Sequence, residues 1–202
     1  MSPIELFIIA FILGIFVFII RIYVESKNSD FVYQKSKIDD QKYLVRNVNN
    51  KQDAADMLAE IRKRLIKFCA YLNEEYPTDK RIIRTITRFT PDNIYENYPD
   101  EGDESTSYSM NKGEKIYFCL RDKKNKSNLV NLNVVMFVAF HEMAHIMTLS
   151  TGHTEEFWNN FKFILKNAVK LGVYKYIDFA SKPLNYCGVK ITTSPWKPSS
   201  KT

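Results

Sequence analysis

An unbroken apolar run near the N-terminus sets the first limit on the fold. Residues 6–20 read LFIIAFILGIFVFII, and no charged or polar side chain interrupts them. A helix buried in a water-soluble domain normally keeps a polar face, and this run has none. With its flanks, residues 4–24 would form a helix about 31 Å long, which matches the hydrocarbon core of a bilayer. The run therefore predicts one transmembrane helix, with residues 1–25 as an N-terminal anchor.

A cleaved signal peptide is the alternative interpretation of this run. No Lys or Arg precedes the run, so the basic segment that usually begins a signal peptide is absent. Basic residues follow it instead, at Arg21, Lys27, Lys35 and Lys37. Because basic side chains near a span favour the cytoplasmic face, we expect a single-pass protein with its C-terminal domain in the cytoplasm.

The composition indicates one folded domain after the anchor. Of the 202 residues, 45% are hydrophobic and 26% are charged, which is typical of a chain with a packed core. The net charge of +6 is compatible with nucleic acid or a lipid surface but does not require either. Three widely spaced cysteines, Cys69, Cys119 and Cys187, favour unpaired thiols in a reducing compartment.

Hydrophobic periodicity predicts an α+β domain over residues 53–195, after a polar linker at 26–52 and before a flexible tail at 196–202. Apolar residues at three- and four-residue steps predict helices at 53–75, 129–148 and 154–172, the last with Thr154 as its N-cap. β-branched runs and a turn signal predict strands at residues 43–48, 81–89, 106–110 and 115–121. The acidic stretch 92–104 and the basic stretch 121–128 are interpreted as loops.

The three histidines of the chain fall within one 13-residue window. Two of them belong to the sequence His141-Glu142-Met143-Ala144-His145, an H-E-x-x-H motif inside a predicted helix. A spacing of four places both imidazoles on one helical face, where they can bind a single Zn²⁺. Glu142 lies beside that face, where its carboxylate can act as general base toward a zinc-activated water.

His153 is the expected third metal ligand. It follows Gly152, which is expected to turn the chain after the active-site helix, and it precedes the next helix. Three protein ligands and one open position are the arrangement of a catalytic zinc site, whereas a structural site usually has four protein ligands. Glu155 and Glu156 are the rival ligands, and either would convert the site from His₃ to His₂Glu.

These residues resemble a known family. The motif at 141–145, together with His153-Thr154-Glu155-Glu156-Phe157-Trp158, resembles the WLM and SprT-like zinc metallopeptidases, and the tail Asn185-Tyr186-Cys187-Gly188 looks similar to membrane-anchored WLM-like proteins of large nucleocytoplasmic DNA viruses. The resemblance implies a zincin-like domain, His141, His145 and His153 as zinc ligands, and Glu142 as general base. The group includes proteases that digest DNA–protein crosslinks, but its nuclear members are soluble and lack this N-terminal span.

Together these observations predict a membrane-anchored zinc metallopeptidase that acts on a protein or peptide substrate. Its fold would be a zincin-like domain with helices on a small antiparallel sheet, whose edge strand, expected at 115–121, could pair with a peptide backbone. Two other functions stay open. One is a non-catalytic structural protein of a virion or cell membrane that zinc stabilises. The other is a membrane-tethered protease of the DNA–protein crosslink type, which the lysines at 162, 166 and 170 and the basic loop suggest.

Overall fold

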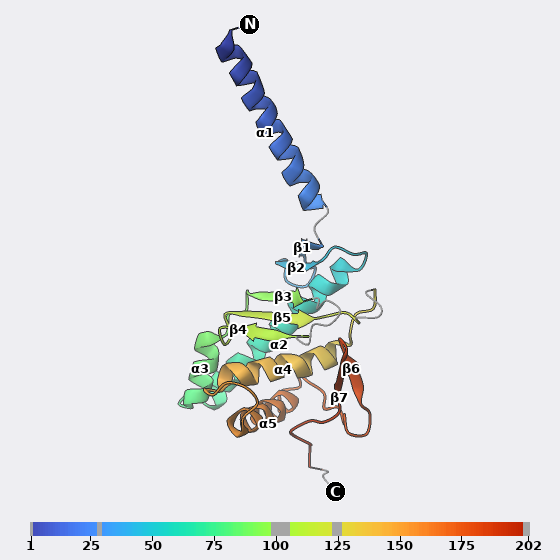
Figure 1. The fold of residues 1–202 in the computed structure, drawn as a ribbon. Coiled ribbons are helices and arrows are strands. Elements are labelled where there is room, and N and C mark those ends of the chain that lie inside the picture. Colours follow the sequence, from blue (N-terminus) through green and yellow to red (C-terminus); the bar gives the residue numbers. More distant parts are fainter. Residues whose placement is uncertain (1, 28–29, 98–105, 123–126, 200–202) are drawn as a thin grey trace.

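The computed structural model describes residues 2–27, 30–97, 106–122 and 127–199. Its first helix, α1 (Pro3–Lys27), stands apart from the rest of the molecule (Figure 1). Within α1, the 22 residues Pro3–Val24 are long and apolar enough to span a membrane, and none of the apolar window is buried. This exposure excludes a helix of the protein core, while a membrane span and a signal sequence share the observed length and composition.

The domain that follows is α+β, as predicted. Helix α4 lies at its centre and packs against α2, α3, α5 and the strands β4 and β5. In chain order the elements are β1 (Phe31–Lys35), β2 (Lys42–Arg46), α2 (Lys51–Glu75), α3 (Lys80–Arg88), β3 (Ile94–Asn97), β4 (Tyr108–Met110), β5 (Lys115–Cys119), α4 (Leu132–Met147), α5 (Glu155–Lys170), β6 (Leu184–Tyr186) and β7 (Val189–Ile191).

The sheet beside α4 has the strand order β3-β5-β4. Strand β4 is antiparallel to β5, as the predicted hairpin requires, whereas β3 runs parallel to β5, so the sheet is mixed rather than antiparallel. The prediction that residues 115–121 form the sheet edge is wrong, because β5 is the central strand. β4 is the edge strand that lies beside α4.

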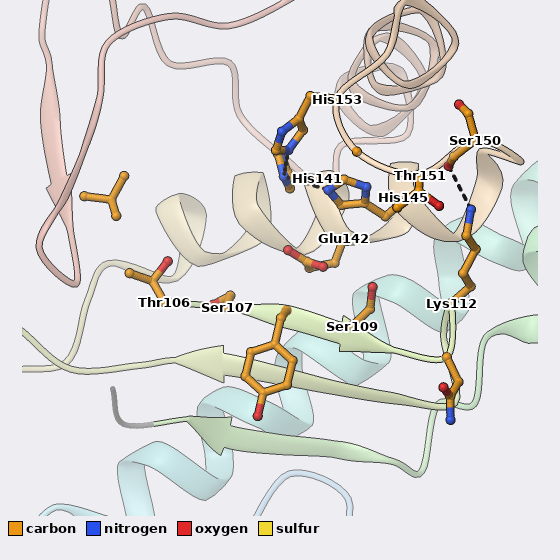
Figure 2. Close-up of a pocket in the computed structure, with 14 residues that line it drawn as sticks. Thr106, Ser107, Ser109, Lys112, His141, Glu142, His145, Ser150, Thr151 and His153 are labelled. Atoms are coloured by element: carbon orange, nitrogen blue, oxygen red, sulfur yellow. Dashed lines mark hydrogen bonds between the residues drawn. The ribbon is translucent and has the colours of Figure 1, made fainter. Parts of the chain in front are cut away.

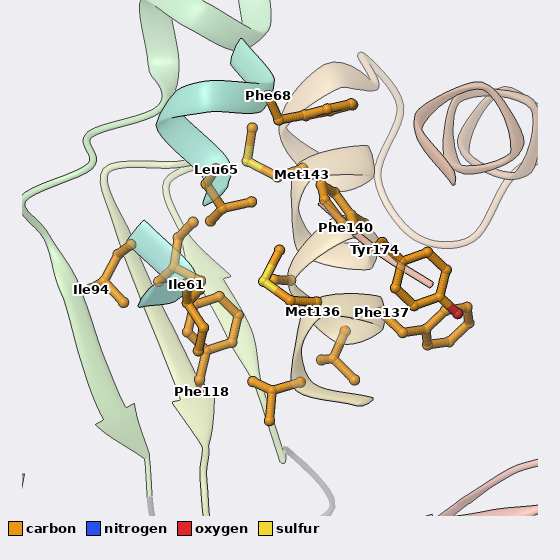
Figure 3. Packing of buried hydrophobic residues seen from close by; sticks show 14 of the residues in the cluster. Ile61, Leu65, Phe68, Ile94, Phe118, Met136, Phe137, Phe140, Met143 and Tyr174 are labelled. Carbon is orange, nitrogen blue, oxygen red and sulfur yellow. The ribbon is translucent and has the colours of Figure 1, made fainter. Parts of the chain in front are cut away.

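The hydrophobic core forms where α2 and α4 meet the three-stranded sheet (Figure 3). Phe68 of α2 meets Phe140 of α4 edge-to-face, with ring centroids 5.0 Å apart. Aromatic pairs in this arrangement stabilise a core beyond the area that they bury. Ile61 from α2 and Phe118 from β5 are fully buried in the same cluster. The cluster makes α4 a rigid platform for the side chains on its opposite face.

Residues 80–88 form helix α3, so the predicted strand at 81–89 is wrong. The Asp79 side chain accepts a hydrogen bond from the backbone N–H of Arg81 at 2.8 Å, which caps the helix. Ile82 and Thr85 are buried at a three-residue spacing that suits a helix and not a strand. The β-branched composition favoured a strand, but the cap and the one-sided burial decide the conformation.

The two-stranded sheet β1–β2 lies within residues 26–52, for which the sequence predicts a polar linker. Tyr43 and Val45 of β2 are buried, and β2 contacts α2 and β3. Helix α2 begins at Lys51, two residues before the start of the helix predicted at 53–75. These strands therefore pack as part of the folded domain.

The prediction of three unpaired cysteines is wrong, because Cys119 and Cys187 form a disulfide. The bond joins the end of β5 to the turn between β6 and β7, across 68 positions of sequence. Cys69 is free and buried in α2. The two paired residues look unrelated in the sequence, and only the fold brings their Cα atoms to 6.3 Å. Unpaired thiols therefore no longer support a reducing compartment.

The two charged loops are described only in part. The acidic stretch 92–104 contains β3, and its residues 98–104 lie outside the described residues, as do 123–126 of the basic stretch and 200–202 of the tail. Arg121, the first residue of the basic stretch, has a fully buried side chain whose Nε lies 2.6 Å from the Glu96 carboxylate. It is not accessible to a nucleic acid phosphate.

Candidate metal centre

Helix α4 presents His141 and His145 from the side that faces away from the core. The Asn131 side chain caps the helix start by accepting a hydrogen bond from the Asn133 N–H. Almost every apolar residue of α4 is buried, whereas both imidazoles are only partly buried. The helix thus offers two ligands, one turn apart, at the boundary between core and solvent.

The structure brings His153 to the same point as the two α4 histidines (Figure 2). The His141 Nε2 atom lies 3.2 Å from His145 Nε2 and 3.0 Å from His153 Nε2. Two nitrogens bound to one tetrahedral ion at about 2.0–2.1 Å lie about 3.4 Å apart. Both distances are close to that value, and the donor atoms of all three histidines lie within 4.8 Å of one another, so the cluster could hold a single zinc ion. All three histidines line one cleft.

The loop that carries His153 is held from two sides. The Lys112 ammonium, in the turn between β4 and β5, donates to the carbonyl oxygens of Thr148, Leu149 and Ser150 at 2.8, 2.8 and 2.9 Å. Gly152 follows with φ +82°, a left-handed conformation that favours glycine. This clamp positions His153 without contacting it.

Glu156 holds the loop from the other side. Its carboxylate accepts hydrogen bonds from the backbone N–H groups of Leu149 and Ser150 at 3.0 and 3.1 Å, and these bonds lower its pKa. Within the described residues, the cluster of potential ligands contains three histidines whose donor atoms lie within 4.8 Å of one another, and it does not include Glu155 or Glu156. The geometry favours a His₃ site over a His₂Glu site.

Aromatic side chains of α5 orient the imidazoles. The Phe157 ring centroid lies 4.3 Å from that of His145, 4.8 Å from His153 and 4.9 Å from His141. Trp158 stacks on His153 at 5.6 Å. Thr154 caps α5, as predicted, and thereby fixes where the helix starts and where these rings lie. The Phe-Trp pair therefore supports the three candidate ligands.

The environment keeps the α4 imidazoles neutral. Burial, together with the neighbouring histidines, lowers the pKa of His141 to about 3 and, with Lys112 also contributing, that of His145 to about 4. Neutral imidazole is the form that binds a metal ion. Near neutral pH these two side chains are therefore ready to act as ligands.

Glu142 points toward strand β4, below the histidines in Figure 2. Its side chain is 4% exposed, and burial raises its pKa to about 7. The Ser109 hydroxyl and backbone oppose that shift, because they favour the charged carboxylate. Glu142 can therefore gain or lose a proton near neutral pH, as a general base must.

The three histidines and Glu142 open onto one cleft of about 620 Å³. Ser107, Tyr108 and Ser109 of the β4 segment line its opposite wall. A metal-ion site, an adjacent carboxylate and an edge strand thus share one cavity, which is an arrangement suited to hydrolysis of an extended chain.

Sequence reasoning did not identify Ser109 and Lys112 as contributors to this site. Lys112 lies in the turn between the strands predicted at 106–110 and 115–121, but nothing in the sequence of that turn indicates contact with residues 148–150. Ser109 alternates along a short strand like any polar residue. Both roles depend on contacts between distant segments, so a single sequence carries little signal for them.

Comparison with known proteins identifies the family. The model of the WLM domain matches residues 36–195. An uncharacterized protein of Acanthamoeba polyphaga mimivirus is 37% identical over 174 residues, which cover 83% of this chain and 85% of the viral protein. An uncharacterized protein of Invertebrate iridescent virus 6 is 38% identical over 84 residues, covering 40% of this chain and 44% of that protein.

Among solved structures, Wss1 from Saccharomyces cerevisiae has a TM-score of 0.49 and 22% identity, covering 63% of this chain and 85% of the yeast chain. The WLM match extends over more than half of the sequence, and the mimivirus relative is similar along most of both proteins. This chain therefore belongs to the WLM domain family, a family of zincin-like metallopeptidases.

Proposed function

We propose that this chain is a membrane-anchored, zinc-dependent peptidase in which His141, His145 and His153 bind the metal and Glu142 is the general base. The observation that carries the proposal is the close approach of three imidazole nitrogens in a cleft that also contains a buried carboxylate. The WLM family assignment supports the same chemistry.

In the proposed reaction, the metal and the protein side chains have different roles. Zinc held by His141, His145 and His153 would supply Lewis acidity and would lower the pKa of a bound water toward about 7. Glu142 accepts the proton of the attacking water on its carboxylate and passes it to the leaving amine. The Ser109 hydroxyl and backbone, close to that carboxylate, favour its charged form. The Lys112 clamp keeps His153 in place during the reaction.

The substrate is proposed to be a protein segment in an extended conformation. Among the strands of the described residues, β4 is the last in the sheet order on the cleft side. An extended peptide that pairs with this edge gains main-chain hydrogen bonds with little dependence on sequence. Its backbone would then cross the cleft between β4 and the three histidines.

The anchor is proposed to be the exposed apolar helix α1. Its 22-residue candidate span contributes nothing to the domain core, so insertion into a bilayer would leave the fold intact. The basic residues after the span favour a cytoplasmic domain. Flanking charge is the only support for this orientation, since the Cys119–Cys187 disulfide is the kind of bond that an oxidising compartment favours.

Peptidase activity can be tested with Glu142→Gln, which removes the base and keeps a similar shape. Cleavage of an unfolded, fluorophore-labelled protein should fall about 100-fold or more, while bound zinc stays unchanged. Glu155→Gln is the matched control, since the same change is made at an exposed side chain close to the cleft. Cleavage by Glu142→Gln at the rate of the parent, with zinc retained, would contradict the assigned role.

A further inference from the structure

A second hollow adjoins the metal-binding cleft. It has a volume of about 170 Å³ and a mainly apolar wall, whose polar members are Thr106, Ser107, His141 and Glu142. Its apolar members come from two elements far apart in sequence. Helix α4 contributes Phe137 and Val138, and the C-terminal hairpin of β6 and β7 contributes Tyr186, Val189 and Ile191. The hairpin rises beside α4 in Figure 1 and forms the reddish strand across the cleft from the histidines in Figure 2.

This hollow opens beside the proposed reacting groups. His141 and Glu142 line both the hollow and the cleft, and so does Val189. A peptide lying along β4 with its scissile carbonyl near the histidines would therefore direct a neighbouring side chain into the hollow. No other described cavity shares both His141 and Glu142 with the cleft.

The hairpin wall is held in place by two links. The Tyr186 hydroxyl and the Ser107 hydroxyl are 2.7 Å apart and share a hydrogen bond. The adjacent Cys187 is covalently bound to Cys119 at the end of β5. Because both links connect the hairpin to the sheet segment that lines the cleft, the wall keeps a defined position relative to the metal site.

The apolar lining of the hollow determines which substrate side chain it can bind. A charged side chain would exchange its hydration for contact with Phe137 and Val138, which is unfavourable without an ion partner. An acidic side chain would also meet the Glu142 carboxylate. An apolar cavity of about 150 Å³ is large enough to bind benzene, so this hollow has room for a side chain of the size of leucine or phenylalanine.

We propose that this hollow is a substrate subsite that selects a medium-sized apolar side chain on a residue flanking the scissile bond, with Val189 as its specificity-determining residue. The assignment rests on the proposed peptidase function and names its preferred substrates: segments with Leu, Met or Phe beside the cleaved bond. Such segments are buried in folded proteins, so the subsite favours unfolded or extended chains.

The test uses the full chain, purified in detergent with zinc, and a series of extended peptides that differ at one position. Peptides with Leu or Phe at the selected position should be cleaved with kcat/KM about 10- to 100-fold above those with Asp or Gly. Val189→Phe, which fills the hollow, should remove most of this preference, whereas Val189→Ala should shift it toward larger side chains. Val189 is 45% exposed, so neither change disturbs the core.

Lys190→Phe is the matched control, because it adds the same ring one position along β7, on the opposite face of the hairpin. It should leave the preference unchanged. Equal cleavage of all peptides by the parent, or an unchanged preference in both Val189 variants, would overturn the subsite while leaving the peptidase proposal standing.

A peptide-binding experiment tests the subsite independently of peptidase activity. The same peptides carry a fluorophore, and their binding to the full chain with Glu142→Gln is measured by titration. This measurement does not require hydrolysis. Tighter binding of the Leu and Phe peptides, lost when Val189→Phe is added, supports the subsite even if the parent cleaves nothing. Equal affinity for all the peptides would overturn it.

Discussion

Loss of the Cys119–Cys187 bond should destabilise the domain strongly. The bond closes a loop over 68 positions of sequence, and a cross-link of this length removes conformational entropy from the unfolded chain. The loop-entropy relation gives about 4 kcal/mol of free energy of unfolding at about 25 °C. For a domain of about 170 residues, each kcal/mol shifts Tm by about 2–4 °C, so we expect a fall of about 10–15 °C.

The measurement compares thermal unfolding of the parent with the double variant Cys119→Ala, Cys187→Ala. The chain without residues 1–27 suits this assay, because the core starts at Tyr43 and the apolar window of α1 is not buried. Cys69→Ala is the control, since it removes a buried sulfur without removing a cross-link. Its Tm should fall by only a few degrees.

Two results would refute this reasoning. The unfolded, unreduced parent should expose one reactive thiol, that of Cys69, and finding three would show that the bond does not form. A double variant with the Tm of the parent would show that the hairpin and β5 are held together by packing alone.

Three further outcomes are expected. The chain without residues 1–27 should bind one zinc ion by metal analysis. His153→Ala should weaken zinc binding strongly, whereas Glu155→Gln should not. If His153 is only a surface residue, His153→Ala will leave the zinc affinity unchanged. Lys112→Met should lower zinc affinity about 10-fold in a competition titration, because it releases the loop carbonyls before His153; unchanged affinity would show that Glu156 suffices to hold the loop. The full chain should stay in the membrane pellet after carbonate extraction, whereas recovery in the supernatant would exclude an anchor, and a mature N-terminus near Lys27 would favour a signal peptide.

Helices with a strong local signal were predictable from the chain alone. The apolar steps of α2, the dense apolar face of α4 and the Thr154 cap of α5 are encoded within one or two turns of each residue. The H-E-x-x-H motif is equally local, since a spacing of four determines that two imidazoles share a helix face. The prediction that His141 and His145 share one site therefore depends on helix geometry alone and not on contacts with distant segments.

Elements with conflicting local signals were decided by the fold. Residues 80–88 have the composition of a strand, yet the Asp79 cap and burial of only one side make them helical. Strands β6 and β7 are three residues each, too short for a hydrophobic pattern to show. Parallel pairing of β3 with β5 joins segments about 20 residues apart, and no turn sequence signals it.

The sequence by itself determined the apolar N-terminal helix, the helix that carries the H-E-x-x-H motif and the identity of the candidate ligands, because each depends on residues within a few positions of one another. Only the tertiary structure decided that β4 is the sheet edge, that Lys112 and Glu156 hold the loop before His153, and that Cys119 pairs with Cys187. These features depend on contacts between segments distant in the chain. Such contacts form when the core packs, and no short stretch of sequence encodes them.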